Sequence, residues 1–386
     1  MMHILRPFYA LIPLFSCLLL TAACTAWRGK VLERKWLSQS KDHYSIQKGQ
    51  KQGSATLYYT GCGGFAIDYN GEKILLDPYF SNIGIPGVVF HRLRPDTALI
   101  NDFFRKKLNI ERDTTGQIST ILISHAHHDH LGDVPYLLEN KLTNNNVKVF
   151  GSRTAINLLC SFPDLAQDSA AQMNNLQPYF KYHATTAQKK SEPPISPFFY
   201  TPDKHIRFAA VPSNHVGHYK TCKTHKIPFT KGQVNKPLNK PPYFGIRYKE
   251  GDSYNYLIDL LDDNGTILFR IYANAGAASD AGVGYPPAEV LQEKSVDLLL
   301  ICGANYNMAD DYPMPMLEFL QPKLVFVAHW ENFFQSVTEL RKKTEVVPNT
   351  DIRKLMKILE KSKAEKGFPE AFFIEHPQLR GVRFDF

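Results

Sequence analysis

The 386-residue sequence contains no C-x-x-C pair, no internal repeat and no long apolar run after Trp27. The first absence leaves a thiolate zinc site of the finger type without support. Because a membrane-spanning helix needs roughly 18 apolar residues, no segment beyond Trp27 is expected to cross a bilayer. The 44% hydrophobic and 21% charged residues exclude a disordered or collagenous chain. We therefore expect a water-soluble globular body that needs no disulfide scaffold.

Residues 1–24 have the pattern of a secretory signal. A short head with Arg6 precedes the apolar stretch 8–20, and small residues then lead to Cys24. This end resembles the lipobox of bacterial lipoproteins, in which the cysteine receives the lipid. We expect an exported protein of the cell envelope, anchored to the membrane through lipidated Cys24 and facing the periplasm or the exterior. Cys17 is a competing lipid site, and a cleaved soluble form or an uncleaved anchor are the alternatives.

The rest of the chain is predicted to form one domain. Residues 25–53 are polar and lack periodicity, so they are expected to be a tether. A single α+β domain is expected over 54–340, completed by a helix and a strand within 341–386. Strands are predicted at 55–60, 64–69, 73–76, 120–123, 147–150, 206–211, 243–248, 254–260, 266–272, 298–301 and 324–327. Helices are predicted from a Thr97 cap through Leu108 and after an Asp351 cap.

Four histidines and an aspartate lie within six residues, directly after the apolar run 121–123. The segment reads His125-Ala126-His127-His128-Asp129-His130. Imidazole and carboxylate are ligands that zinc prefers, and residues two apart at a strand end can point into one site. The segment therefore predicts a metal centre rather than a solvated polar loop.

The His-x-His-x-Asp-His pattern after a strand is the signature of the metallo-β-lactamase superfamily, which this sequence resembles over roughly residues 55–335. The run Leu76-Asp77-Pro78-Tyr79-Phe80-Ser81 is similar to a turn of the branch that contains N-acyl phosphatidylethanolamine phospholipase D and the ascorbate-phosphate lactonases. The resemblance implies an αββα sandwich in a single domain, with metals at one edge of two sheets.

The resemblance also implies a ligand set for one or two zinc ions. It comprises His125, His127, Asp129, His130, His215, Asn274 and His329. His215 follows the strand at 206–211, with His218 as the rival for the same role. Asp129 is in addition the expected catalytic residue, which orients a metal-activated water and accepts its proton. His128 is expected outside this ligand shell.

Asn274 departs from the family pattern. The family places an aspartate there that bridges both metals, whereas a neutral amide brings no negative charge. The second metal is therefore expected to bind weakly, unless Asp280 compensates by folding back. A catalytically decayed binding protein is the alternative that this departure leaves open.

Residues 204–249 give a clue to the substrate. This stretch holds ten Lys or Arg residues and no Asp or Glu, and it includes His215. A positive field at the rim would attract an anionic small molecule or lipid. We therefore expect a phosphodiesterase acting on an anionic ester or a phospholipid-like substrate. Lactone or β-lactam hydrolysis, binding to lipid headgroups and a plain basic loop remain alternatives, and nucleic acid is disfavoured for an exported chain.

Six cysteines are present, at positions 17, 24, 62, 160, 222 and 302. An oxidising compartment would permit disulfides among them, and their spacing does not indicate which would pair. Cys62 lies in a Gly-Cys-Gly-Gly turn where relatives often have Gly-His. We expect Cys62 and Cys302 to be plain buried cysteines rather than parts of the site.

Overall fold

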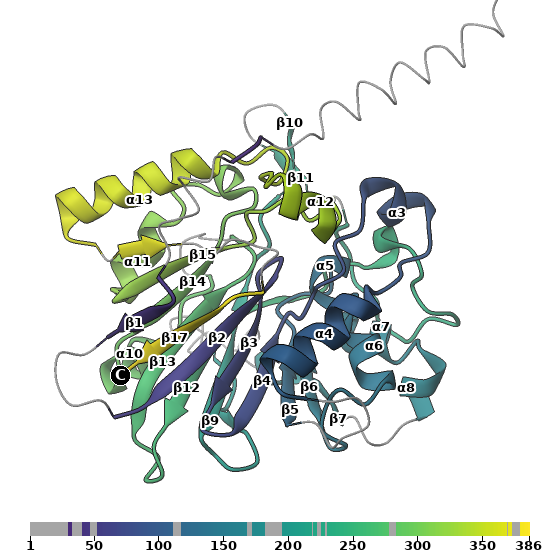
Figure 1. The fold of residues 1–386 in the computed structure, drawn as a ribbon, viewed down its shortest axis with the longest axis horizontal. Helices are drawn as coiled ribbons and strands as arrows, with labels where there is room; N and C mark the ends of the chain where they lie inside the picture. The colour runs from purple at the N-terminus through teal and green to yellow at the C-terminus, as the bar shows by residue number, and fades with distance from the viewer. Residues whose placement is uncertain are drawn as a thin grey trace, which may run out of the picture.

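The structure is a computed structural model that describes residues 30–32, 41–46, 52–110, 117–167, 172–181, 195–217, 219–221, 225–227, 230–277, 283–368, 370–372 and 379–386. In these segments two mixed sheets face each other, and helices cover their outer sides (Figure 1). No helix within these segments combines the length and apolar character needed to cross a membrane.

The first sheet has eight strands. In spatial order they are β1 (His43–Ser45), β17 (Gly381–Asp385), β2 (Ser54–Gly61), β3 (Gly64–Tyr69), β4 (Glu72–Leu76), β5 (Ile118–Leu122), β6 (Lys148–Gly151) and β7 (Gln172–Asn175). The predicted hairpin turn between β3 and β4 is confirmed, because Asn70 and Gly71 both have positive φ. From β4 to β7 the strands are parallel, so their carboxyl ends lie at one edge.

The second sheet has seven strands. In order they are β16 (Glu370–Phe372), β15 (Leu324–Ala328), β14 (Leu298–Cys302), β13 (Ile267–Asn274), β12 (Ser253–Leu261), β9 (Ile206–Ser213) and β8 (Phe199–Tyr200). Strands β13 to β16 are parallel. A separate two-stranded sheet pairs β10 (Tyr219–Thr221) with β11 (His225–Ile227).

The helices are short, with α4 and α13 the longest in the described segments. The α-helices are α3 (Ile85–Phe90), α4 (Thr97–Lys107), α5 (His128–Leu131), α6 (Val134–Glu139), α7 (Arg153–Leu159), α8 (Pro163–Gln167), α9 (Gln177–Lys181), α10 (Ala288–Glu293), α11 (Met314–Leu320), α12 (Val337–Lys342) and α13 (Ile352–Lys366). The predicted cap of α13 is confirmed, because Asp351 accepts a bond from the Lys354 N–H. The cap of α4 is Asp96 rather than Thr97, since the Asp96 carboxylate accepts from the Leu99 N–H at 3.0 Å.

Three apolar clusters correspond to the three interfaces of an αββα sandwich. One fills the space between the sheets, and the other two lie under the helices on either outer face. The predicted fold class, an α+β sandwich in a single domain, is therefore confirmed.

Two local predictions were wrong. Residues 243–248 do not form a strand but contain a 3₁₀ turn, η2 (Gly245–Arg247), because Gly245 packs so closely on Val88 that a Cβ there would lie 2.6 Å from a Val88 methyl. The described parts of 25–53 are not a free tether. Tyr44 of β1 is buried between the sheets, where its ring stacks on Phe372, and this burial holds the segment against the domain.

Candidate metal centre

Three histidines converge from two strand ends to form the first cluster. His125 and His127 follow β5, and His215 follows β9. One nitrogen from each imidazole lies within 4.8 Å of the others, and the ring centroids are 4.6–4.7 Å apart. Three protein nitrogens with room for a fourth ligand are typical of a catalytic zinc site.

The imidazoles are oriented for ligation. Nδ1 of His215 lies 2.6 Å from the Val216 carbonyl oxygen, which only accepts, so Nδ1 carries the hydrogen and Nε2 keeps its lone pair. Nδ1 of His125 lies 3.0 Å from the Ser124 hydroxyl, and its buried Nε2 has no hydrogen-bond partner among the described residues. Burial and the neighbouring histidines lower the pKa of His125 well below its usual value. His125 is thus neutral, as a metal ligand must be.

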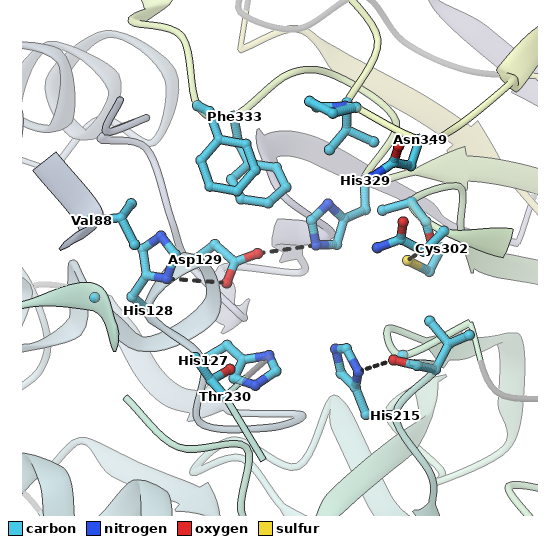
Figure 2. A pocket seen from close by; sticks show the side chains of 18 of the residues that line it. Val88, His127, His128, Asp129, His215, Thr230, Cys302, His329, Phe333 and Asn349 are labelled. Atoms are coloured by element: carbon cyan, nitrogen blue, oxygen red, sulfur yellow. Dashed lines mark hydrogen bonds and ion pairs between the residues drawn. The ribbon is translucent and has the colours of Figure 1, made fainter. Parts of the chain in front are cut away.

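A second cluster lies beside the first and consists of Cys62, Asp129 and His329, with potential ligand atoms within 4.8 Å of one another. All three side chains are buried, and Nε2 of His329 lies 3.3 Å from an Asp129 carboxylate oxygen (Figure 2). Burial raises the pKa of Asp129, but the neighbouring imidazole of His130, a hydrogen bond with His329 and the nearby imidazole of His128 outweigh burial and hold the pKa well below its usual value. Asp129 is therefore ionised at neutral pH.

His130 and His128 flank this second cluster. Nε2 of His130 lies 3.7 Å from the Asp129 carboxylate, and its ring centroid lies 3.9 Å from that of His125. His130 therefore stands between the two clusters. His128 belongs to neither cluster, although its Nδ1 lies 3.7 Å from Asp129 and it lines the cavity.

Asn274 ends β13 and is buried, and its side-chain oxygen lies 3.4 Å from the donating Tyr312 hydroxyl. It does not line the main cavity but a smaller one, which shares Ala275 and Cys302 with it. His218 and Asp280, the two alternative residues, lie outside the described residues.

The main cavity opens over both clusters and has a largely apolar wall. Its polar lining includes His127, His128, Asp129, His215, Cys302 and His329, and its apolar lining includes Val88, Val89, Ile246, Phe333, Phe334, Val347 and Pro348 (Figure 2). No Lys or Arg lines it among the described residues. The floor therefore offers metal ligands, while the walls offer apolar contacts.

The basic segment 204–249 does not place its described charges in this cavity. Thr230 and Ile246 of the segment do line it. Arg207, however, pairs with Asp259 and Glu293 at the opposite end of β9. Among the described residues, nearness to His215 along the sequence therefore brings no positive charge to the cavity wall, and Arg207 pairs with acidic residues instead.

Asp77, which was not among the predicted site residues, contacts His130 and the residue that precedes His125. It follows β4, is fully buried, and accepts a 2.7 Å bond from the Ser124 N–H and a second bond from the Ser124 hydroxyl. Its other contact is His130 Nδ1, at 3.0 Å. The available signal was a carboxylate placed directly after the apolar run 74–76.

Replacing Asp77 with asparagine should weaken metal binding by about 10–100-fold, the usual effect of losing a carboxylate that orients a ligating histidine. The reason is that an amide removes the negative charge beside His130 and, with one oxygen in place of two, cannot accept from the Ser124 N–H on one side and from the Ser124 hydroxyl and His130 on the other. Titration of the metal-free protein with zinc against a competing chelator measures the effect. The exposed Asp263, replaced in the same way, is the control, and equal affinity in both variants would contradict the assigned role.

Glu331 is a second supporting residue that the sequence did not reveal. This buried carboxylate accepts bonds from the Tyr59 hydroxyl at 2.6 Å and from the Cys62 N–H at 2.8 Å. The Tyr59 hydroxyl in turn accepts a bond from the His329 N–H at 2.7 Å. One carboxylate thus connects the turn that carries Cys62 to the loop that carries His329.

Comparison with known proteins agrees with this architecture. Residues 72–225 match the family described as "Beta-lactamase superfamily domain". A protein of Polynucleobacter asymbioticus named as a metal-dependent hydrolase is 25% identical over 284 residues, which cover 73% of this chain and 76% of that protein.

The solved structures found in the comparison share little sequence with the chain and have TM-scores below 0.5. Igni18, a metallo hydrolase from Ignicoccus hospitalis, has a TM-score of 0.48 and 16% identity, covering 86% of this chain and 99% of its own. A protein of Parabacteroides distasonis described as a metal-dependent hydrolase has a TM-score of 0.43 and 13% identity, covering 90% and 99%. The αββα sandwich and the two ligand clusters agree with the match of residues 72–225 to the beta-lactamase superfamily domain, and the chain is similar to metal-dependent hydrolases.

Proposed function

We propose that the protein is a zinc-dependent phosphodiesterase whose substrate is a phospholipid-like diester with an apolar group. The observation that carries this proposal is a cluster of three imidazoles, two of which, His127 and His215, line a cavity with apolar walls. A set of three histidines favours zinc over magnesium or calcium, which prefer oxygen ligands. Bound zinc would also supply positive charge toward a phosphate, which the described wall residues do not provide.

Each residue of the site has a task in this proposal. His125, His127 and His215 would hold a zinc ion, which when bound lowers the pKa of water toward about 7 and polarises the substrate oxygen. Asp129, ionised at neutral pH, orients the attacking water and accepts its proton.

The apolar wall would bind the substrate's hydrocarbon part and keep bulk water away from the reacting phosphorus. Val88 and Phe333 are buried in the wall, and Ile246 is half-buried on the cavity side. Because each buried methylene contributes about 0.8 kcal/mol, enclosing two of them stabilises the complex by roughly 1.6 kcal/mol, or somewhat more than tenfold. The wall therefore predicts a preference for longer alkyl chains.

Two substrates that differ only in chain length test this proposal: p-nitrophenyl methyl phosphate and p-nitrophenyl octyl phosphate. The zinc-loaded full chain should hydrolyse both, with kcat/KM about tenfold or more higher for the octyl diester. Ile246→Ser should reduce that preference, whereas the exposed Leu238→Ser should not.

The possible failures have separate meanings. Equal kcat/KM for the two diesters would contradict the role of the apolar wall. Binding of the octyl diester to the zinc-loaded protein without release of p-nitrophenol would contradict the phosphodiesterase and favour a binding protein in which Asn274 has ended catalysis.

A further inference from the structure

The turn between β2 and β3 lies against the second ligand cluster. Gly61, Cys62 and Gly63 all have positive φ, so the turn is tight. Positive φ is uncommon for a residue with a side chain, such as Cys62 at the centre of this turn. A Cβ built on Gly63 would lie 3.7 Å from the His329 ring and 3.8 Å from the His130 ring. The turn therefore holds the fully buried Cys62 at the metal edge.

Cys62 is within reach of the other members of this cluster. Its Sγ, a carboxylate oxygen of Asp129 and a ring nitrogen of His329 all lie within 4.8 Å of one another. Zinc bonds are about 2.3 Å to sulfur and about 2.0–2.1 Å to nitrogen, so small side-chain movements bring these three atoms onto one ion. His329 also has a buried Nδ1 without a hydrogen-bond partner among the described residues.

Hydrogen bonds through Glu331 and Tyr59 fix the positions of Cys62 and His329 relative to each other. Glu331 accepts the Cys62 N–H directly and holds the His329 N–H through Tyr59. Carboxylates that position ligand-bearing backbone in this way are typical of built metal sites. A cysteine buried only for packing would not need this connection to a histidine 267 positions further along the chain.

Charge balance favours a thiolate at this place. Two dications in a buried site need negative ligands, because uncompensated buried charge is costly. Asn274 is neutral, so Asp129 is the one carboxylate among the ligands that the structure brings together here. A metal ion deprotonates a coordinating thiol, which then contributes one negative charge.

We propose that Cys62 is a ligand of the second metal ion, together with Asp129 and His329, and that its thiolate supplies the negative charge that Asn274 does not. On metal binding the Cys62 S–H bond breaks, the S–metal bond forms, and the proton leaves to solvent. This inference rests on the proposed metal-dependent function. The sequence predicted a weak second metal site, whereas this inference predicts a second metal site that includes a cysteine ligand.

Loading the metal-free full chain with Co²⁺ tests this assignment without measuring activity. Cobalt bound to a thiolate absorbs in the near ultraviolet by sulfur-to-metal charge transfer, whereas cobalt bound only to imidazole and carboxylate does not. We expect two cobalt ions per chain, with this absorption arising from the second. Cys62→Ser should abolish the absorption and lower the affinity for the second cobalt ion by more than about tenfold, while the first ion binds as before.

Matched variants identify the sulfur. Cys302→Ser and Cys160→Ser should keep the absorption, and its loss in Cys302→Ser would overturn the proposal. If Cys62→Ser does not fold, replacing the other five cysteines one at a time identifies Cys62 by elimination. In the double variant Cys62→Ser/Asn274→Asp, binding of the second cobalt ion should be restored without the thiolate absorption.

The outcomes separate this inference from the proposed function. If two cobalt ions bind without thiolate absorption, the Cys62 assignment is wrong and the proposed hydrolase function is not contradicted. If the wild-type protein binds no cobalt and no zinc, both fail together.

Discussion

His127→Ala should abolish hydrolysis by the zinc-loaded protein. His127 is one of three imidazoles in the first cluster, and two of them cannot hold zinc in the arrangement of a three-ligand catalytic site. The loss should exceed the about 10–100-fold that follows removal of an outer partner of a ligand. Elemental analysis of the same sample should find the first zinc missing, which connects the lost rate to the lost metal.

The control for this variant is His91→Ala, because His91 is exposed at the end of α3 and lies outside both clusters. It should leave both the zinc content and the rate unchanged. A His127→Ala protein that keeps full activity would show that the first cluster is not the catalytic centre. Thermal unfolding of both variants distinguishes metal loss from a general loss of structure.

Asp259→Ala should lower the free energy of unfolding by about 3–5 kcal/mol. Asp259 lies on β12 directly between Arg207 of β9 and Arg270 of β13, so one carboxylate joins three neighbouring strands. Arg270 is fully buried and donates to both Asp259 oxygens, at 2.6 and 2.8 Å, and Arg207 donates to one of them at 2.8 Å. Without this carboxylate, the buried positive charge of Arg270 loses its main anionic partner, and this loss destabilises the folded protein.

Urea unfolding followed by circular dichroism measures this effect. Asp263→Ala is the matched control, because the Asp263 side chain is 88% exposed and its removal should change stability by no more than about 0.5 kcal/mol. A loss below about 1 kcal/mol in Asp259→Ala would mean that Glu293, which lies 3.2 Å from Arg270, or water compensates for the missing carboxylate.

The architecture could be predicted because its signals are local. The strands at 64–69, 298–301 and 324–327 are apolar runs between turn residues, and each lies where it was expected. The segment 243–248 has a similar apolar composition but forms a 3₁₀ turn, since close packing of Gly245 on Val88 decides its backbone. Contact with a distant helix cannot be read from a run of six residues.

The site could be predicted in part. His125, His127 and Asp129 lie within one short segment, so their spacing alone indicates a metal site, and the resemblance to a known family extended it to His215 and His329. The signal over residues 1–24 and the lipid at Cys24 remain predictions, because these residues lie outside the described segments.

The sequence by itself determined the alternation of strands and helices and the metal-ligating segment at the end of one strand, because both depend on neighbours along the chain. The tertiary structure decided which distant groups join that segment. It brought Cys62 beside His329, placed Asp77 under His130, and turned Arg207 away from the cavity that its position in the sequence suggested. The physical reason is that sheet order and loop packing determine these contacts, and residues that are distant in the sequence, such as Cys62 and His329, share no local pattern that predicts their contact.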